Sequence, residues 1–248
     1  MFSIDLLNEI RAWEIEHALS HLRQGARILE IGAGTGRQAL ELSKRGFAVE
    51  AIDIPGSDYA GEQLFEVKAY DGRRFPFPDA SFDIVYSSNV LEHLPDLAAA
   101  HREIRRVLRP GGYAVHVLPT HAWRFWTTLS AFPAAFQRAH ALMPAPFGRA
   151  RSQRPASVLR QIARALLSPF AQRRHGERGT ILSELWLFHP NCWRKNFRDN
   201  GYVVERDAPM GLFYTGNLCM GAKWDLPKRC RLAAGLGSAS HLFVLRPA

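Results

Sequence analysis

The sequence has few cysteines and no hydrophobic segment long enough to cross a bilayer. Cys192, Cys219 and Cys230 are the only thiols. Their odd number and the lack of a CxxC pair predict reduced cysteines, with neither disulfides nor a metal site. No apolar run reaches the ~18 residues of a spanning helix. The first residues show no basic flank before an apolar block, so we expect no secretory signal and a cytoplasmic protein.

Acidic residues are almost absent from one long stretch. Residues 121–180 contain ten arginines, no lysine and a single acid, Glu177. The net charge of this stretch therefore equals the +9 of the whole chain of 248 residues, and the remainder is neutral. A basic segment within a neutral protein indicates a local anionic partner. With 47% hydrophobic and 22% charged residues, the chain has an ordinary globular composition, which excludes general disorder.

Strand and helix patterns alternate along the chain. They predict an α/β fold with a Rossmann-like, doubly wound and mostly parallel sheet. The expected strands cover 27–31, 48–54, 64–70, 82–87, 113–118, 202–205 and 241–245, and the expected helices cover 4–24, 37–45 and 95–108. No helix of usual length is evident between the last two strands, so we expect the last strand to be antiparallel.

About eighty residues separate the fifth and sixth strands, whereas a crossover needs only ~30. We therefore expect a single domain, 1–248, with an N-terminal helix (4–24), a core of 25–120 and 181–248, and an arginine-rich helical insertion at 121–180. In this insertion, apolar residues at 158, 159, 162, 166 and 170 share one helical face, and Arg160 and Arg164 lie on the other. Two interpretations are open: a cap that packs on the sheet, or a lid that also contacts an anionic membrane surface.

A glycine-rich turn follows the first expected strand, in the string Glu30-Ile31-Gly32-Ala33-Gly34-Thr35-Gly36. Such a turn lets the backbone approach a ligand, and the helix after it points free N–H groups at that ligand. A dinucleotide site would require glycine at position 37, where Arg37 stands. Asp53 ends the second strand, ~20 residues further on, where a carboxylate can accept hydrogen bonds from ribose hydroxyls.

Three further motifs follow at matching spacing. They are the segment from Asp71-Gly72 to Val85, the string Asn89-Val90-Leu91-Glu92-His93-Leu94, and Val107-Leu108-Arg109-Pro110-Gly111-Gly112. With the glycine turn, they resemble class I S-adenosylmethionine-dependent methyltransferases, in particular the subgroup that methylates quinones and small metabolites. The resemblance covers residues 27 to 118.

The resemblance implies S-adenosylmethionine as cofactor and S-adenosylhomocysteine as product. Asp53 would bind the ribose, Asp71 would face the adenine, and Glu30 would reach the methionine end. The full set of implied cofactor contacts is Glu30, Gly32, Ala33, Gly34, Thr35, Gly36, Asp53, Ile54, Asp71, Gly72, Ser88, Asn89 and His93. Two structural alternatives stay open: Asp71 could instead cap a turn, and His93 could be a core histidine.

Three histidines are candidates for a general base: His93, His121 and His175. His121 follows the fifth strand, and His175, between glycines, could close over the site as a lid. His189 precedes Pro190, which indicates a helix start. No metal ligand set is evident.

We expect methyl transfer to a small or lipid-linked acceptor, at oxygen rather than at nitrogen or carbon, and the basic insertion is compatible with an anionic acceptor. Nucleic acid is disfavoured, because neither Asn-Pro-Pro-Tyr, Asp-Pro-Pro-Tyr nor Pro-Cys follows the fourth strand. Peripheral membrane contact through the insertion is compatible with this expectation, and no oligomeric state is indicated. The alternatives are a non-catalytic module that binds S-adenosylmethionine and an enzyme of the same fold with non-methylating chemistry.

Overall fold

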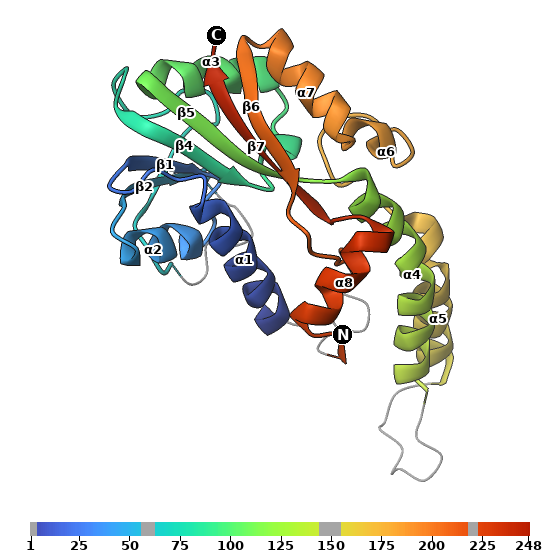
Figure 1. Ribbon diagram of the computed structural model, residues 1–248. Helices are drawn as coiled ribbons and strands as arrows, with labels where there is room; N and C mark the ends of the chain where they lie inside the picture. Colours follow the sequence, from blue (N-terminus) through green and yellow to red (C-terminus); the bar gives the residue numbers. More distant parts are fainter. Residues whose placement is uncertain (1–3, 56–62, 144–154, 218–222) are drawn as a thin grey trace.

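A computed structural model describes residues 4–55, 63–143, 155–217 and 223–248, which surround a seven-stranded sheet (Figure 1). The strand order is β3-β2-β1-β4-β5-β7-β6. The strands are β1 (Arg27–Ile31), β2 (Ala48–Asp53), β3 (Val67–Ala69), β4 (Phe82–Ser88), β5 (Leu108–Pro119), β6 (Tyr202–Pro209) and β7 (Ser240–Pro247). Strands β1 to β5 are parallel, and β7 is antiparallel to both β5 and β6. The predicted fold class is confirmed.

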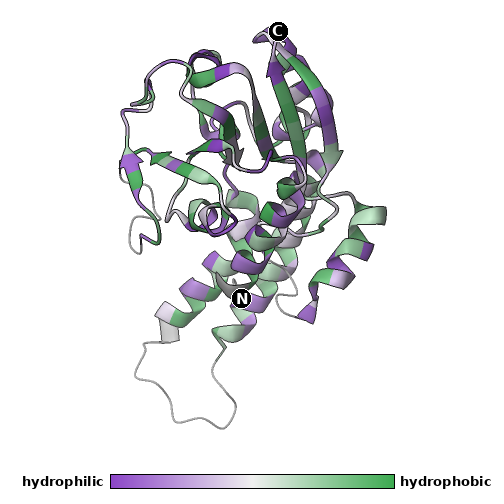
Figure 2. Ribbon diagram, turned by 60° about the vertical axis from the view of Figure 1, so that its left-hand side comes forward, coloured by the Kyte–Doolittle hydropathy of each residue, from purple (hydrophilic) through white to green (hydrophobic). Residues whose placement is uncertain are grey.

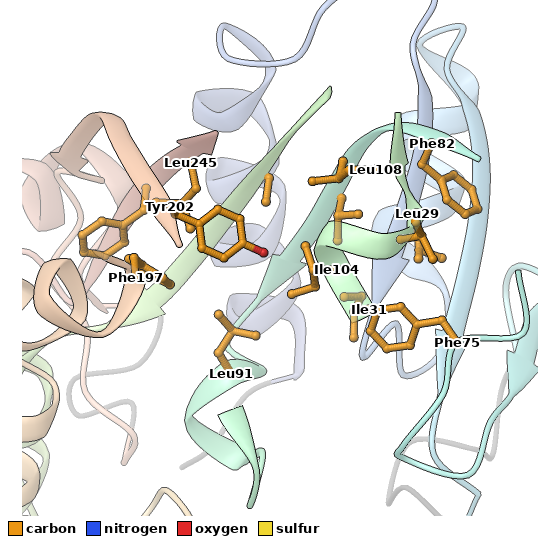
Figure 3. Close-up of a cluster of buried hydrophobic side chains, with 14 of the residues drawn as sticks. Leu29, Ile31, Phe75, Phe82, Leu91, Ile104, Leu108, Phe197, Tyr202 and Leu245 are labelled. Atoms are coloured by element: carbon orange, nitrogen blue, oxygen red, sulfur yellow. The ribbon is translucent and has the colours of Figure 1, made fainter. Parts of the chain in front are cut away.

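Helices cover both faces of the sheet. They are α1 (Ile4–Leu19), α2 (Arg37–Lys44), α3 (Leu97–Val107), α4 (His121–Ala141), α5 (Pro155–Leu167), α6 (Glu184–Leu187), α7 (Pro190–Asp199) and α8 (Leu226–Leu236), with 3₁₀ turns η1 (Leu91–His93) and η2 (Ser168–Ala171). Side chains of α3 and α7 fill the core on one face, and those of α1 and α2 fill it on the other. Figure 3 shows the first of these cores, in which Leu91 of η1 packs beside Ile104 of α3.

The structure corrects one expectation near the C-terminus. A helix, α8, does separate β6 from β7. Its start carries the usual signals, because the Asp225 side chain accepts a hydrogen bond from Lys228 N and Pro227 lies in the first turn. The last strand is antiparallel as expected, although the reason given for it was wrong.

Helices α4 and α5 form a hairpin that projects away from the sheet (Figures 1 and 2). The main contacts of α5 are with α4 and η2. Large apolar side chains of the hairpin are exposed instead of packing on the sheet: Phe125, Leu129, Phe132, Phe136, Leu159, Leu166, Leu167 and, in η2, Phe170. Other side chains of α4, such as Ala131 and Ala135, are buried, so a cap and a membrane-contacting lid both stay predictions. Arg149, Arg151 and Arg154 lie outside the described residues.

No helix in the described ranges has the length and hydrophobicity needed to span a bilayer. Cys192 and Cys230 are free thiols, and Cys219 lies outside the described residues.

Candidate functional site

The glycine turn, residues 32–36, lies at the carboxyl end of β1 and is tied to β2. The N–H groups of Gly32 and Ala33 donate to the Ile52 carbonyl at 2.9 and 3.1 Å. Gly32 has φ of 69°, and a Cβ there would lie 2.4 Å from a methyl of Val90. Gly36 has φ of 76°, and a Cβ there would lie 2.7 Å from Phe65 Cβ. The protein's own packing therefore requires glycine at both positions.

Asp53 supports this turn from the end of β2. Its Oδ2 accepts a hydrogen bond from Gly34 N at 2.7 Å, and its Oδ1 accepts one from Ile54 N at 2.7 Å. Each carboxylate oxygen has a second lone pair, so the group can still accept from ribose hydroxyls. The side chain of Ile54 is half exposed beside it, which suits contact with a flat apolar ring.

Asp71 caps a turn, which was the structural alternative. Its Oδ1 accepts from the N–H groups of Arg73 and Arg74 at 2.8 and 2.9 Å. The bond from Arg74 is the main cause that lowers the pKa of this fully exposed carboxyl. Gly72 follows with φ of 74°. Asp71 therefore has a structural role in this turn, and contact between Asp71 and the adenine stays a proposal.

Glu30 is a buried carboxyl beneath the glycine turn. Its side chain is 1% exposed, and no hydrogen-bond partner for Oε2 is found among the described residues. Burial is the main cause that raises its pKa to about 8, and the nearby charge of Asp53 adds to it. The group is therefore protonated at neutral pH, with an oxygen available to a ligand. This orphaned oxygen, together with the turn that only glycines can form, fits the methionine end of S-adenosylmethionine.

Ser88 and Asn89 follow β4 and meet two residues of α1 that the sequence interpretation missed. Ser88 Oγ lies 3.5 Å from Arg11 Nη1, 3.4 Å from Glu14 Oε2 and 3.0 Å from Asn89 Nδ2. Arg11 and Glu14 form an ion pair at 2.5 Å, and the Glu14 side chain is fully buried. The available signal was an arginine and a glutamate three residues apart among the apolar positions of an amphipathic helix.

The four histidines of this edge form two separate pairs. The rings of His93 and His175 are 4.7 Å apart, and those of His121 and His189 are 4.5 Å apart. Burial lowers the pKa of His93 and of His121, and it lowers that of His175 to about 4. His189 caps α7 through a hydrogen bond from Asn191 N, which confirms the helix start. The sequence could not show which imidazoles would pair.

His175 lies in a segment, residues 172–179, whose backbone is held by hydrogen bonds to two glutamates. Glu184 Oε1 accepts from the N–H groups of His175 and Gly176 at 2.6 and 2.7 Å. Glu177 N donates to the Glu92 carbonyl at 2.9 Å, which joins the segment to η1. The indole of Trp123 lies 4.6 Å from the His175 ring. These contacts hold the segment in the observed position, and closure of His175 over the site stays a prediction.

Glu92 stands between the two histidines of the first pair. Its Oε1 is 3.8 Å from His93 Nε2 and 3.9 Å from His175 Nε2. Neither carboxylate oxygen has a hydrogen-bond partner among the described residues, and the side chain is fully buried. Burial is the main cause that raises the pKa of Glu92 to about 8. His93 is thus not a satisfied core histidine, because it is partly exposed beside an unpartnered acid.

A surface hollow of about 690 Å³ lies elsewhere, around His21, Arg23 and Arg246. It contains none of the expected site residues. The polar and titratable side chains described above lie instead near the carboxyl ends of β1 and β4.

Comparison with known proteins agrees with this geometry. Residues 29–116 match the methyltransferase domain family. Over 112 residues, 39% of this chain and 29% of the relative, the sequence is 33% identical to sterol 24-C-methyltransferase erg6 of Aspergillus fumigatus. Over 104 residues, 37% of this chain and 38% of the relative, it is 34% identical to 27-O-demethylrifamycin SV methyltransferase of Amycolatopsis mediterranei. The match therefore spans about a third of the length of these relatives.

Solved structures show the same fold. A methyltransferase from Aquifex aeolicus, described as S-adenosylmethionine-dependent, superposes with a TM-score of 0.53 at 15% identity and covers 100% of both chains. One from Mesorhizobium loti gives 0.53 at 19% identity over 94% of this chain and 97% of its own. Residues 29–116 thus match the methyltransferase domain family, and the chain shares the fold of solved S-adenosylmethionine-dependent methyltransferases, as predicted.

Proposed function

We propose that the whole chain transfers a methyl group from S-adenosylmethionine to an oxygen of a small or lipid-linked acceptor. The observation that carries the proposal is the glycine turn with Asp53 bonded to Gly34 N and the orphaned Glu30 oxygen beneath it. The cofactor supplies an activated methyl group on a good leaving group. The chain then has to bind the cofactor, hold the acceptor in line and exclude water.

Residues 32–36 would hold the methionine end, Asp53 the ribose, and Ile54 and Asp71 the adenine. The acceptor would lie at Ser88, Asn89 and the Glu92–His93–His175 cluster, which continue from the same edge of the sheet. A hydroxyl acceptor loses a proton during transfer. The imidazoles of this cluster are neutral at pH 7, so one of them can accept this proton. His121, whose ring pairs with that of His189, is the weaker candidate for the general base.

Binding of the cofactor is tested by titration calorimetry with S-adenosylhomocysteine. Asp53→Asn and Gly34→Val should each weaken binding at least tenfold. Asp53→Asn removes a charged acceptor of hydrogen bonds, which contributes ~1.5–3 kcal/mol. Gly34→Val places a side chain in the turn that would hold the cofactor. Asp199→Asn, at an exposed carboxylate paired with Lys195, is the matched control and should bind like the wild type. Unchanged binding in both site variants would refute the assignment.

Transfer is tested separately with methyl-labelled S-adenosylmethionine and hydroxylated acceptors, both free and lipid-linked. Label in a methyl ether supports the proposal. Tight cofactor binding without transfer to any acceptor identifies a binding module, and conversion without label transfer identifies non-methylating chemistry.

A lipid-linked acceptor is favoured because the hairpin of α4 and α5 exposes both apolar and basic side chains. Phe136 is 67% exposed, Leu159 68% and Phe170 78%. Arg138, Arg160 and Arg164 are exposed on the same two helices. Apolar side chains that enter the headgroup region, with arginines that meet anionic lipids, are typical of peripheral membrane helices.

The hairpin also begins beside the acceptor side of the site. Its first turn carries Trp123, which contacts His175, and Thr120 caps it with a hydrogen bond from Trp123 N. A hairpin that lies on the membrane would thus place the cluster near an acceptor whose lipid remains in the bilayer.

Flotation with anionic vesicles tests this part. Arg138, Arg160 and Arg164 contribute ~1 kcal/mol each, so changing all three to Gln should lower partition by a factor of about 100. Changing Arg102, Arg198 and Arg231 to Gln removes the same charge elsewhere and should have much less effect. Wild-type binding should also weaken at high salt. No binding by the intact chain would refute membrane contact while leaving cofactor binding untouched.

A further inference from the structure

We propose that Glu92, His93 and His175 bind one divalent transition-metal ion. The sequence indicated no metal site, because its cysteines have no ligand spacing. The cluster forms only when η1 and the segment of residues 172–179 come together, which they do through the bond from Glu177 N to the Glu92 carbonyl.

The geometry places three ligand atoms close to one point. One ligand atom from each of Glu92, His93 and His175 lies within 4.8 Å of the other two. Around an ion at ~2.0–2.2 Å from nitrogen and oxygen ligands, neighbouring ligand atoms are about 3–4 Å apart. The distances from Glu92 Oε1 to Nε2 of His93 and of His175, 3.8 and 3.9 Å, therefore need little adjustment. The His93 and His175 side chains are 41% and 33% exposed, so an ion can reach them from solvent.

The buried carboxyl is the second, independent observation. Glu92 is fully buried, and both of its oxygens lack a hydrogen-bond partner among the described residues. Buried polar groups in folded proteins are almost always satisfied, and an unsatisfied one calls for a missing partner such as an ion. Leu91 fixes the position of this carboxyl, because it is itself buried in the core beneath η1 (Figure 3).

The positive charges near the cluster are each paired with a carboxylate. Arg11 is paired with Glu14 at 2.5 Å, and Arg124 is 3.1 Å from Glu184. Arg174 lies 3.2 Å from Glu177, which leaves Glu92 without a cationic partner of its own among the described residues. The cluster therefore has a negative electrostatic balance once Glu92 is ionised.

The ligand types select the class of ion. Imidazole nitrogens prefer zinc, cobalt, nickel, copper or iron, whereas magnesium and calcium prefer oxygen ligands. Three protein ligands leave at least one coordination position open, as in catalytic rather than structural sites. An acceptor oxygen bound at that position would lose its proton more readily. With the ion bound, this effect would replace proton transfer to His93 or His175, because their ligating nitrogens would then be occupied. This consequence for the reaction rests on the proposed function, but binding of the ion does not.

The test measures binding of Zn²⁺ and Co²⁺ to the full chain after treatment with a chelator, without cofactor or acceptor. Titration against a chromophoric chelator should show that the protein binds one equivalent of Zn²⁺. Bound Co²⁺ should show the visible absorption bands that are typical of a Co²⁺ ion with a low coordination number. Mg²⁺ in excess should displace neither.

Two ligand variants and one control decide the outcome. Glu92→Gln keeps the shape of the side chain, and His175→Ala removes an imidazole, so each should weaken Zn²⁺ binding at least ~tenfold. His121→Ala disrupts the other histidine pair and should bind like the wild type. Far-ultraviolet circular dichroism shows whether each variant is folded. Wild-type protein that takes up no stoichiometric Zn²⁺, or folded ligand variants that bind as tightly as the wild type, would overturn the proposal. Since cofactor binding is measured separately, failure here leaves the proposed function standing.

Discussion

The buried ion pair between Arg124 and Glu184 gives a sharp prediction about stability. The side chains are 3% and 0% exposed, and Arg124 Nε lies 3.1 Å from Glu184 Oε2. The second carboxylate oxygen holds the N–H groups of His175 and Gly176. The pair therefore joins α4 to α6 and fixes the segment that carries His175.

Removal of one partner leaves an uncompensated buried charge, which costs about 3–5 kcal/mol. Arg124→Leu and Glu184→Gln should each lower the free energy of unfolding by roughly this amount. In the double variant no charge remains, and the glutamine oxygen can still accept from His175 N and Gly176 N. We expect the double variant to lose about 2 kcal/mol or less.

Urea denaturation of the four proteins measures the coupling. The exposed pair of Lys195 and Asp199 serves as control, and Lys195→Gln should change stability by less than ~0.5 kcal/mol. If the losses of the two single variants simply add in the double variant, the charges do not stabilise each other and the reasoning is wrong.

Two further predictions concern the glycine turn. The raised pKa of Glu30, about 8, means that the folded protein keeps a proton that the unfolded chain loses above pH ~4.5. The stabilisation is complete below pH ~4.5 and declines as the pH rises to about 8. Glu30→Gln should therefore be more stable than the wild type at pH 9, by up to about 5 kcal/mol, and nearly as stable as the wild type at pH 4.5. Urea titrations at both pH values check this, and parallel pH profiles would contradict it. Gly32→Ala should cost about 2–4 kcal/mol from its positive φ and its contact with Val90. Val90→Ala in the same chain should recover part of that loss in thermal unfolding, and no recovery would show that the contact is not the cause.

The fold and the geometry of the glycine turn with Asp53 were predictable because their signals are local. The glycines at 32, 34 and 36 all have positive φ, a conformation that glycine adopts readily, so the residue types themselves indicate the turn. Asp53 follows directly from its place at the end of β2, since β2 pairs in parallel with β1.

The proposed acceptor region could not be predicted, because it depends on contacts between distant segments. Arg11 and Glu14 belong to a helix whose apolar residues alone predict only packing. The pairing of His93 with His175, rather than with His121, depends on how Glu184 and Glu177 hold residues 172–179. The helix α8 was missed although Asp225 and Pro227 carry an ordinary start signal, since glycines surround it.

The hydrogen bonds of Glu14 have a consequence for the order in which the chain acquires its structure during synthesis. Glu14 Oε1 accepts from the hydroxyls of Tyr214 and Ser240, both at 2.9 Å. While a ribosome is still making the protein, residues 29–116 are available long before these donors emerge. The carboxylate of Glu14 therefore stays without these two donors until residue 240 has been translated. The nascent chain can form the glycine turn early, but the hydrogen bonds that hold Glu14 beside Ser88 form only after that point.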